Sequence, residues 1–530
     1  MRHDSGLHRP SVRRAADALT AEERAALSSE LGGLIERFTV DGLAAPLIAA
    51  GFSDPIGATR RLREWLAGTP LALRPDSERA SLEAVLPAMI AELGRFADSD
   101  AALATLDEIV GRLPADIALF SAFEARPSLM ASLLGLLGHA PALARHLIAQ
   151  PGLASRMIDS SAYAPLPSPA QLDTEFALLL REDGDRAAGP SKVAQAIAGY
   201  RFALGLQLLE ASDDALDVGI ANCDLAEAGL RAMADDVLAR MKEQHGLVPG
   251  AELVILALGR FGGRSLTSSS DLDIIYLFTG DYRASSDGRK PLDANEYFSR
   301  VAQQVTMAMS VLTPLGPLYE VDTRLRPWGA KGMLACSTET YRRYHSENAW
   351  TWEHMALTRA RPVYGPDAAR KEAKAIISER LRAPRDRAAL LQDAVKMRAD
   401  IARHKPARGA FDVKLLAGGL VDLEFAVHVN QLDTQVGINP RLRSAIGAQV
   451  DAGLLDAAMI DAHATLSRML IVLRMLSPHC HEPAPEQRGP IAQACGFEDW
   501  DGLVAGFDAA RETVRAGWSQ VIGRPDKLDG

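Results

Sequence analysis

The chain has 530 residues, of which 48% are apolar, and its 68 acidic residues outnumber its 58 basic residues to give a formal net charge of −10. A chain this apolar can bury enough surface to offset the entropy lost on ordering, so its composition excludes a mostly disordered protein. The length predicts about three domains. The acidic balance argues against a protein that binds nucleic acid, because such proteins present a basic surface.

Cysteine content and hydropathy bear on the compartment. The four cysteines are too few and too scattered for a disulfide framework, which is typical of a reducing compartment. The two most apolar stretches, residues 128–138 and 305–318, do not reach the roughly 20 apolar residues that a spanning helix needs. No apolar segment follows the arginines near the N-terminus, so no secretion signal is expected. We therefore expect a soluble, cytoplasmic protein with no membrane partner.

The first 225 residues predict a succession of helices. Alanine, leucine, glutamate and arginine dominate, and breaker segments such as residues 51–55 separate the helical runs. Between Ile56 and Leu66, apolar residues recur at helical rather than alternating spacing. We expect residues 1–80 to form an N-terminal helical linker region and residues 81–225 to form a helical lead-in.

The sequence changes character near residue 251. Residues 252–258 and 272–278 are short apolar runs, which predicts two buried strands. Helical spacing returns from Ala294 to Val311, and residues 318–326 then alternate apolar with charged side chains, as a half-buried strand does. These elements predict a small mixed sheet set among helices.

Helical patterns resume at about residue 367 and continue to the end of the chain. The expected fold class is therefore α+β and predominantly helical. We expect the sheet to lie in a core of residues 226–365, flanked by helical domains, with residues 366–530 forming a C-terminal helical bundle.

The central chemical signal is Asp271-Leu272-Asp273, where the second predicted strand begins. Residues two apart on a strand face the same side, so the two carboxylates project together. Neighbouring carboxylates repel each other unless a cation lies between them, and Mg²⁺ prefers oxygen ligands. Asp322, on the charged face of the strand predicted at 318–326, adds a third acid. Three such carboxylates can hold one or two Mg²⁺ ions for phosphoryl transfer, although Mn²⁺ suits the same ligands.

Residue types that suit phosphate binding surround this motif. They offer glycine backbone, a hydroxyl group and guanidinium groups: Gly262, Gly263, Ser270, Arg324 and Arg326. Glycine lets backbone N–H groups approach a triphosphate closely. The two arginines share the charged face of the predicted strand with Asp322, where they could neutralise phosphate charge. The glycine spacing is not that of dinucleotide-binding folds, and no helix is expected directly after the first strand.

Each feature alone is weak, because an Asp-x-Asp pair at a strand start and a Gly-Gly pair are both most often simple turns. Their combined order is much rarer: strand, glycine pair, spacer, Asp-x-Asp, helix and acid-bearing strand. That order resembles the polymerase-beta-like nucleotidyltransferases.

Four further stretches resemble the glutamine-synthetase adenylyltransferase family. They are Tyr-Glu-Val-Asp-Thr-Arg-Leu-Arg-Pro from residue 319, Ala-Trp-Thr-Trp-Glu-His from residue 349, Phe-Asp-Val-Lys from residue 411 with Gly-Gly-Leu-Val-Asp-Leu-Glu-Phe after it, and Gly-Phe-Glu-Asp-Trp from residue 496. They occur in the family's order, and the likeness covers nearly the whole chain from about Gly51.

The resemblance implies Mg²⁺-dependent transfer of AMP from ATP to a tyrosine of glutamine synthetase, with release of pyrophosphate, which regulates nitrogen assimilation. Full-length members of the family are bifunctional and carry two such halves, one that attaches AMP and one that removes it by phosphorolysis. This chain holds one such set, in which an Asp-x-Asp pair at a predicted strand start is combined with Asp322 as third acid, and it is most similar to the C-terminal, adenylylating half. We therefore do not expect the adenylyl-removing activity.

The resemblance also implies site residues. Asp271, Asp273 and Asp322 would be both metal ligands and catalytic residues. Further contacts to the nucleotide or its metal would come from charged residues in the later motifs: Glu353, Arg359, Arg361, Lys414, Asp422 and Glu424. Two of these motifs have a plainer interpretation. The spacing of Trp350 suits a packed core, where we expect its side chain, and two acids after a Gly-Gly pair suit the first turn of a helix.

Other functions fit parts of the pattern. Relatives that uridylylate the nitrogen-signal protein PII share the Asp-x-Asp motif, but the Trp-Thr-Trp-Glu and Gly-Gly-x-x-Asp-x-Glu-Phe motifs favour the adenylyl branch. A non-catalytic half that senses PII and glutamine is a further alternative, and the intact set of three acids argues against it. A nucleic-acid polymerase is disfavoured by the net charge of −10. The expected partners are glutamine synthetase and PII, with glutamine as an effector.

Overall fold

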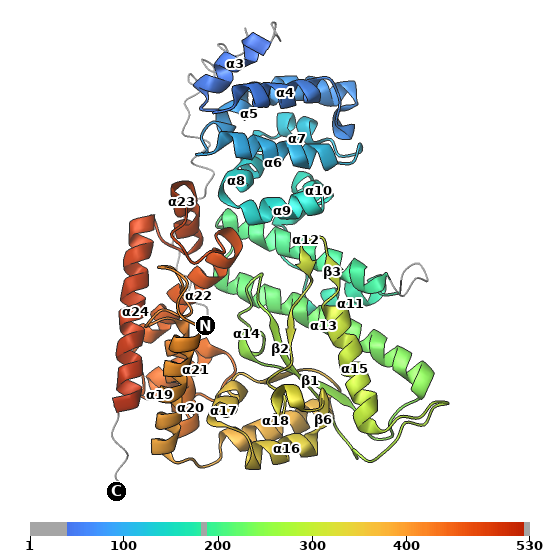
Figure 1. Ribbon diagram of the computed structural model, residues 1–530, viewed down its shortest axis with the longest axis vertical. Helices are drawn as coiled ribbons and strands as arrows, with labels where there is room; N and C mark the ends of the chain where they lie inside the picture. Colours follow the sequence, from blue (N-terminus) through green and yellow to red (C-terminus); the bar gives the residue numbers. More distant parts are fainter. Residues whose placement is uncertain (1–39, 182–187, 524–530) are drawn as a thin grey trace, which may run out of the picture.

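The computed structural model describes residues 40–181 and 188–523 of the protein. It is predominantly helical with a small mixed sheet, which confirms the expected fold class at this level (Figure 1). The N-terminal helices lie at the top of Figure 1, the sheet lies below them, and the C-terminal helices stand beside the sheet. The first 39 residues of the expected linker region lie outside the described part of the chain.

The N-terminal part is a stack of short helices. In chain order they are α3 (Val40–Ala49), α4 (Pro55–Leu66), α5 (Asp76–Leu93), α6 (Ser99–Arg112), α7 (Leu119–Ala125), α8 (Pro127–His139), α9 (Pro141–Ala149) and α10 (Leu153–Ile158). Proline opens α4, α8 and α9, where its fixed φ suits the first helical turn and its missing N–H costs no hydrogen bond. Trp65 is fully buried in this stack, and its indole N–H donates to Asp107 at 2.6 Å.

Three helices connect the stack to the sheet: α11 (Pro169–Leu179), α12 (Gly189–Leu209) and α13 (Ala215–His245). The expected boundaries at 80/81 and 225/226 fall inside α5 and α13. The expected boundary at 365/366 lies just before α18 (Asp367–Leu381).

The sheet is built around its second strand. Its strands are β1 (Leu253–Ala257), β2 (Leu272–Phe278), β5 (Val321–Asp322), β6 (Ala335–Ser337) and β7 (Arg361–Tyr364). β1 lies antiparallel between β2 and β7, whereas β5 and β6 pair parallel with successive parts of β2. The short strands β3 (Leu312–Thr313) and β4 (Gly316–Pro317) form a separate hairpin. The two predicted buried strands are therefore confirmed, and they are neighbours.

The strand predicted at residues 318–326 is much shorter than expected. Only Val321 and Asp322 pair with β2, and the chain then turns. The backbone N–H of Arg324 donates to the Asp322 side chain at 2.8 Å, and that of Arg326 donates to the Thr323 carbonyl at 3.2 Å. Aspartate commonly captures the N–H two residues later in this way, and the resulting turn competes with an extended strand.

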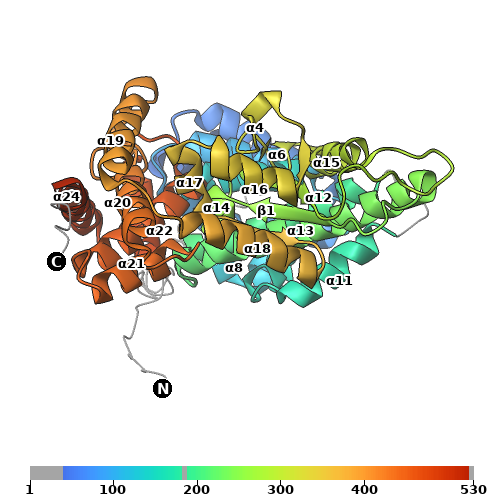
Figure 2. The ribbon, with the colours of Figure 1, turned by 90° about the horizontal axis from the view of Figure 1, so that it is seen from below.

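Helices surround the sheet, as the view in Figure 2 shows. They include α15 (Ala294–Met309), as predicted, and α16 (Thr338–Glu347), both of which contact β2 and β6, and α18, which contacts β1 and β7. The one-turn helix α14 (Gly259–Gly262) follows β1 directly.

The C-terminal bundle is formed by α19 (Arg387–His404), α20 (Leu420–Thr434), α21 (Leu442–Asp451), α22 (Ala458–Leu476), α23 (Pro485–Ala494) and α24 (Trp500–Gly523). It meets the sheet region through α17 (Thr351–Leu357), which contacts α19 and α20.

All four cysteines are free thiols, as predicted. Cys223, Cys336 and Cys495 are buried.

Over residues 40–181 and 188–523, no single helix is both long enough and apolar enough to cross a membrane. Within these described residues, one pair of helices, α8 and α9, passes the same test of length and composition when the two are taken together, but the pair is bent by 112°.

Gly262 marks the closest approach between α14 and the chain leading into β7. A Cβ at this position would lie 1.9 Å from the Arg359 carbonyl oxygen and 2.6 Å from that of Ala257. Backbone atoms cannot yield as a flexible side chain does, so alanine would force the two segments apart.

Gly262→Ala should therefore destabilise the protein, by about 1 to 3 kcal/mol, as overpacked cores do. The measurement is the midpoint of urea unfolding. Gly111→Ala is the matched control, because a Cβ at this exposed position of α6 meets nothing within 4 Å. That control should leave the midpoint unchanged or raise it slightly, and equal midpoints for the two variants would contradict the tight contact at Gly262.

Candidate active site at three carboxylates

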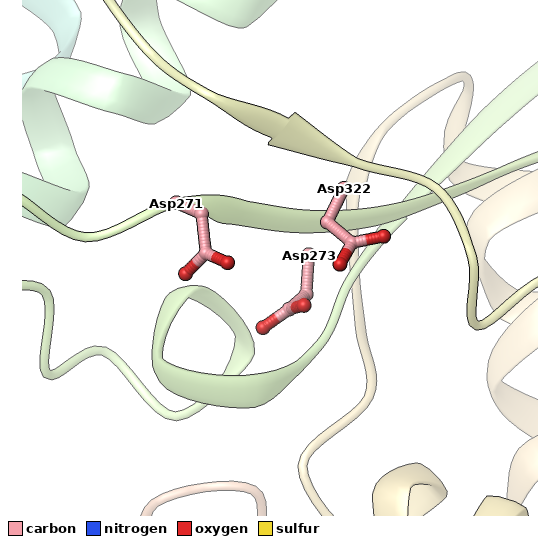
Figure 3. A group of neighbouring side chains, drawn as sticks. All are labelled: Asp271, Asp273 and Asp322. Carbon is pink, nitrogen blue, oxygen red and sulfur yellow. The ribbon is translucent and has the colours of Figure 1, made fainter. Parts of the chain in front are cut away.

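Asp271, Asp273 and Asp322 converge at one edge of the sheet (Figure 3). One carboxylate oxygen from each lies within 4.8 Å of the others. The backbone explains the convergence. Leu272 is fully buried, so the residues on either side of it point away from the core, and the parallel pairing of β2 with β5 places Asp273 opposite Asp322. The structure thus brings together all three predicted acids.

The three charges perturb one another most at Asp273. Burial raises the pKa of this carboxyl group to about 6, and the negative charges of Asp271 and Asp322 add to the effect. The carboxylate also lies against Gly259, where a Cβ would approach its Oδ2 to 2.1 Å and where φ is +52°. Only glycine combines that backbone conformation with this closeness. A concentrated, undercompensated set of carboxylate oxygens fits a divalent cation such as Mg²⁺.

Arg324 forms an ion pair with Asp322. Its Nε lies 3.0 and 2.9 Å from the two carboxylate oxygens, and its Nη2 also donates to Oδ2. These bonds hold the pKa of Asp322 below its ordinary value. The Arg324 side chain is 78% exposed, so little packing fixes it there. A cation at Asp322 would replace Arg324 and free its guanidinium group.

The glycine pair plays a different part from the one predicted. Contrary to expectation, the one-turn helix α14 follows β1 directly, and the amides of Gly262 and Gly263 donate within it, to the carbonyls of Leu258 at 2.7 Å and Gly259 at 3.1 Å. These N–H groups are therefore bound by the protein and not free for a triphosphate. A Cβ on Gly263 would meet the Arg359 guanidinium at 2.5 Å, so the pair serves close packing.

Two other predicted phosphate contacts are engaged in the chain's own turns. The Ser270 hydroxyl accepts from the Thr267 N–H at 2.9 Å and closes the turn that leads into Asp271. Arg326 does not share a strand face with Asp322. Its guanidinium instead donates to the carbonyls of Thr323 at 2.9 Å and Gly332 at 3.2 Å. It fixes the loop after β5, because guanidinium groups suit several carbonyls at once.

The segment from Trp350 differs from the packed core that its spacing predicted. The Trp350 side chain is 70% exposed, because it precedes α17 rather than lying within it. Glu353 is buried and accepts hydrogen bonds from the Trp350 N–H at 2.9 Å and the Tyr344 hydroxyl at 2.8 Å. It thus caps the start of α17.

Two more residues of the later motifs, Arg361 and Asp422, form hydrogen bonds and ion pairs with neighbouring segments of the chain. Arg361 donates to the Gly262 carbonyl at 3.2 Å and pairs with Glu227, so it ties α14 to α13. Asp422 is buried in the first turn of α20, where it accepts from the Gly418 N–H at 2.6 Å and pairs with Arg398. The plainer interpretation of Asp422, an acid in the first turn of a helix, is therefore confirmed.

A buried ion pair joins the sheet region to the bundle beside the carboxylates. Arg359 donates to Glu424 at 2.7 Å and to the Ser265 hydroxyl at 3.1 Å. Burial by itself would raise the pKa of Glu424, but the charges of Arg359 and Arg260 outweigh it and lower that pKa to about 2. Glu424 thus stays ionised and holds two cations next to the three acids.

Arg260 is the site residue that the sequence interpretation missed. It lies on α14, and its Nη2 is 3.9 Å from Glu424 and buried without a hydrogen-bond partner within the described residues. Lys414 lies nearby with an exposed side chain, and its positive charge acts on Asp271 and Asp273. The only signal for Arg260 in the sequence is a cationic residue inside the glycine-rich turn.

Divalent cations should stabilise the protein through the three acids. Mg²⁺ or Mn²⁺ should raise the melting temperature at pH 8, and the gain should shrink as the pH falls through about 6, because protons then compete for Asp273.

Asp273→Asn should remove that gain. It should also stabilise the metal-free protein at pH 8, by on the order of 1 to 2 kcal/mol. The sign follows because a carboxyl group whose folded pKa exceeds its unfolded pKa opposes folding at pH values above both. Asp116→Asn, at an exposed position between α6 and α7, is the control and should do neither. A metal response that survives Asp273→Asn would contradict the site.

Comparison with known proteins gives matches to one family and to proteins of one name. A model of the glutamate-ammonia ligase adenylyltransferase family matches residues 130–376. Three curated proteins named bifunctional glutamine synthetase adenylyltransferase/adenylyl-removing enzyme are similar to the chain: one from Brucella suis (34% identity over 377 residues), one from Xanthobacter autotrophicus (34% over 498) and one from Bradyrhizobium sp. ORS 278 (35% over 473).

These matches cover 69%, 90% and 89% of the chain, but 38%, 50% and 47% of the respective relatives. The chain therefore spans about half the length, or less, of these curated relatives. The resemblance to adenylyltransferases predicted from the sequence is confirmed.

Proposed function

Since a model of the glutamate-ammonia ligase adenylyltransferase family matches residues 130–376 of the chain, we propose that the protein transfers AMP from ATP to a tyrosine of glutamine synthetase and releases pyrophosphate. The observation that carries the proposal is the convergence of Asp271, Asp273 and Asp322. The second activity in the relatives' name, adenylyl removal, is not part of the proposal, because the chain spans half of these relatives or less.

The arrangement of strands supports a polymerase-beta-like nucleotidyltransferase core within residues 226–365. A strand, a glycine-containing turn and a second strand that opens with Asp-x-Asp follow one another, and the third acid comes from the parallel strand β5. We propose a cytoplasmic enzyme of nitrogen regulation that responds to PII and glutamine, as the sequence resemblance implies.

The three acids would hold one or two Mg²⁺ ions, which would offset the charge that builds up on the phosphates and favour ionisation of the attacking phenol. The tyrosine oxygen would attack the α-phosphorus while the bond to the bridging oxygen breaks, so that pyrophosphate leaves. The phenol proton would pass to a carboxylate oxygen of Asp322. Positioning and charge neutralisation would supply most of the rate enhancement.

The cations around Glu424 suit the leaving group. Arg260 has a buried guanidinium nitrogen without a hydrogen-bond partner in the described part of the chain, and Lys414 lies nearby. The charges of Arg260 and Lys414 attract the Asp271 carboxylate, but neither residue forms an ion pair with it within 4 Å in the described part of the chain. We propose that they bind the β- and γ-phosphates. Arg324, whose exposed side chain lies beside Asp322, would contact the α-phosphate from that end of the set.

Intact-mass spectrometry of glutamine synthetase, incubated with the chain, ATP and Mg²⁺, tests the proposed function. Each glutamine synthetase subunit should gain the mass of one adenylyl group. The Asp271→Asn/Asp273→Asn double variant should give no gain, because it loses two of the three proposed metal ligands. If the wild-type chain binds ATP but leaves glutamine synthetase unmodified, glutamine synthetase is ruled out as the acceptor.

Lys414→Met should raise the KM for ATP about tenfold or more, since a hydrogen bond to a charged group is worth about 1.5 to 3 kcal/mol. Steady-state kinetics at saturating glutamine synthetase would measure it. Lys405→Met, at an exposed position just after α19, is the matched control and should leave KM unchanged. Equal KM values for both variants would exclude Lys414 from the triphosphate site.

A further inference from the structure

An aromatic cleft lies beside Asp322, outside the set of three acids. It has a volume of about 650 Å³, and its walls include Trp328, Trp350, Trp352, Arg324 and Lys331. None of the three tryptophans entered the predicted site. Arg324 connects the two regions, because it lines the cleft and also binds the Asp322 carboxylate.

The three tryptophans, here called the tryptophan cluster, are unusually exposed. Trp328 is 50% exposed, Trp350 70% and Trp352 40%. Single exposed apolar side chains are common on protein surfaces, but several indoles around one hollow mark an interaction site. Tryptophan and arginine are also the residue types that most often dominate the binding energy of protein interfaces.

The cleft is held open by buried groups. Trp328 has a left-handed backbone conformation, with φ +59°, which is rare for a bulky residue, and its ring packs on Tyr344 at 4.9 Å. The Tyr344 hydroxyl donates to Glu353, and the same carboxylate accepts the Trp350 N–H. One buried acid thus fixes both the floor under Trp328 and the start of α17. Strain of this kind is retained where surrounding structure enforces it, often at functional sites.

The position of the cleft indicates what enters it. Of the proposed ligands of the leaving phosphates, Arg260 acts on Asp271 and Lys414 acts on both Asp271 and Asp273, whereas Arg324 binds Asp322. Figure 3 shows Asp271 and Asp322 at the two ends of the set. A nucleotide whose phosphates lie toward Asp271 leaves the Asp322 end for the attacking oxygen, and the cleft opens at that end.

We propose that the tryptophan cluster docks the segment of the acceptor protein that carries the target tyrosine. This inference rests on the proposed function and deepens it. The segment would place an apolar or aromatic side chain among the indoles, next to the tyrosine. Arg324 and Lys331 make the cleft cationic, since the carboxylate of Glu353 is buried and already bound, so the segment would carry acidic side chains there.

Binding and chemistry are measured separately to test this. The Asp271→Asn/Asp273→Asn background abolishes transfer, so the dissociation constant for unmodified glutamine synthetase can be measured by biolayer interferometry. Adding Trp350→Ala/Trp352→Ala should weaken that binding about tenfold or more, as loss of interface anchors does. Lys331→Glu should weaken it as well, and most at low ionic strength. Ile56→Ala, a residue on α4 that is 72% exposed, is the matched control and should have no effect.

The affinity of the otherwise wild-type Trp350→Ala/Trp352→Ala variant for ATP, measured by titration calorimetry with Mg²⁺ and a non-hydrolysable analogue, separates the occupants. Unchanged ATP affinity with weakened glutamine synthetase binding supports the proposal. Weakened ATP affinity with unchanged glutamine synthetase binding would show that the cleft holds the nucleobase and would overturn it, as would no effect on either. If wild type binds glutamine synthetase through the cluster but never modifies it, the proposed function fails and the docking surface stands.

Discussion

The repulsion among three carboxylates at one edge of a sheet is the constraint on which the site depends. Parallel pairing of β2 with β5 fixes Asp273 opposite Asp322, and the alternation of β2 adds Asp271. Because strand pairing fixes their positions, the carboxylates cannot move apart without disrupting the sheet. Their negative charge must therefore be compensated by nearby positive groups. Arg324 supplies positive charge directly at Asp322, and Arg260, Arg359 and Lys414 supply it near the junction between the sheet and the bundle.

That demand for positive charge explains how the helical bundle is joined to the sheet. Glu424 on α20 holds Arg359 and Arg260, so the cations near the three acids are positioned by an acid from another part of the chain. A buried ion pair adds little net stability, because desolvation costs about as much as the attraction returns, but it does fix orientation. The close approach of Gly262 and Gly263 to Arg359 extends the same junction.

Much of the site could be predicted because its geometry is local. Asp271 and Asp273 share a face by the period of a strand, and apolar runs of strand length located β1 and β2. The predictions that failed depend on packing between distant segments or on a local turn. The alternation at 318–326 suggested a long strand, but Asp322 captures the Arg324 N–H and turns the chain. Trp350 has core-like spacing, yet it lies before its helix and faces a cleft formed with Trp328.

The predicted glycine contacts show the same dependence on packing. Glycines in a turn signal close approach, but the sequence does not say whether a ligand or a neighbouring backbone comes close, and here the Arg359 backbone does. Arg260 was missed because its importance comes from Glu424, which lies more than 160 residues away in the sequence.

The most direct test of the three-acid site is anomalous X-ray diffraction from crystals grown with Mn²⁺ and a non-hydrolysable ATP analogue. An anomalous peak is expected in contact with carboxylate oxygens of Asp271, Asp273 and Asp322, with the Arg324 guanidinium displaced from Asp322. Terminal phosphates are expected next to Arg260 and Lys414. A bound analogue without metal at the three acids, or with Arg324 still on Asp322, would contradict the three-acid metal site.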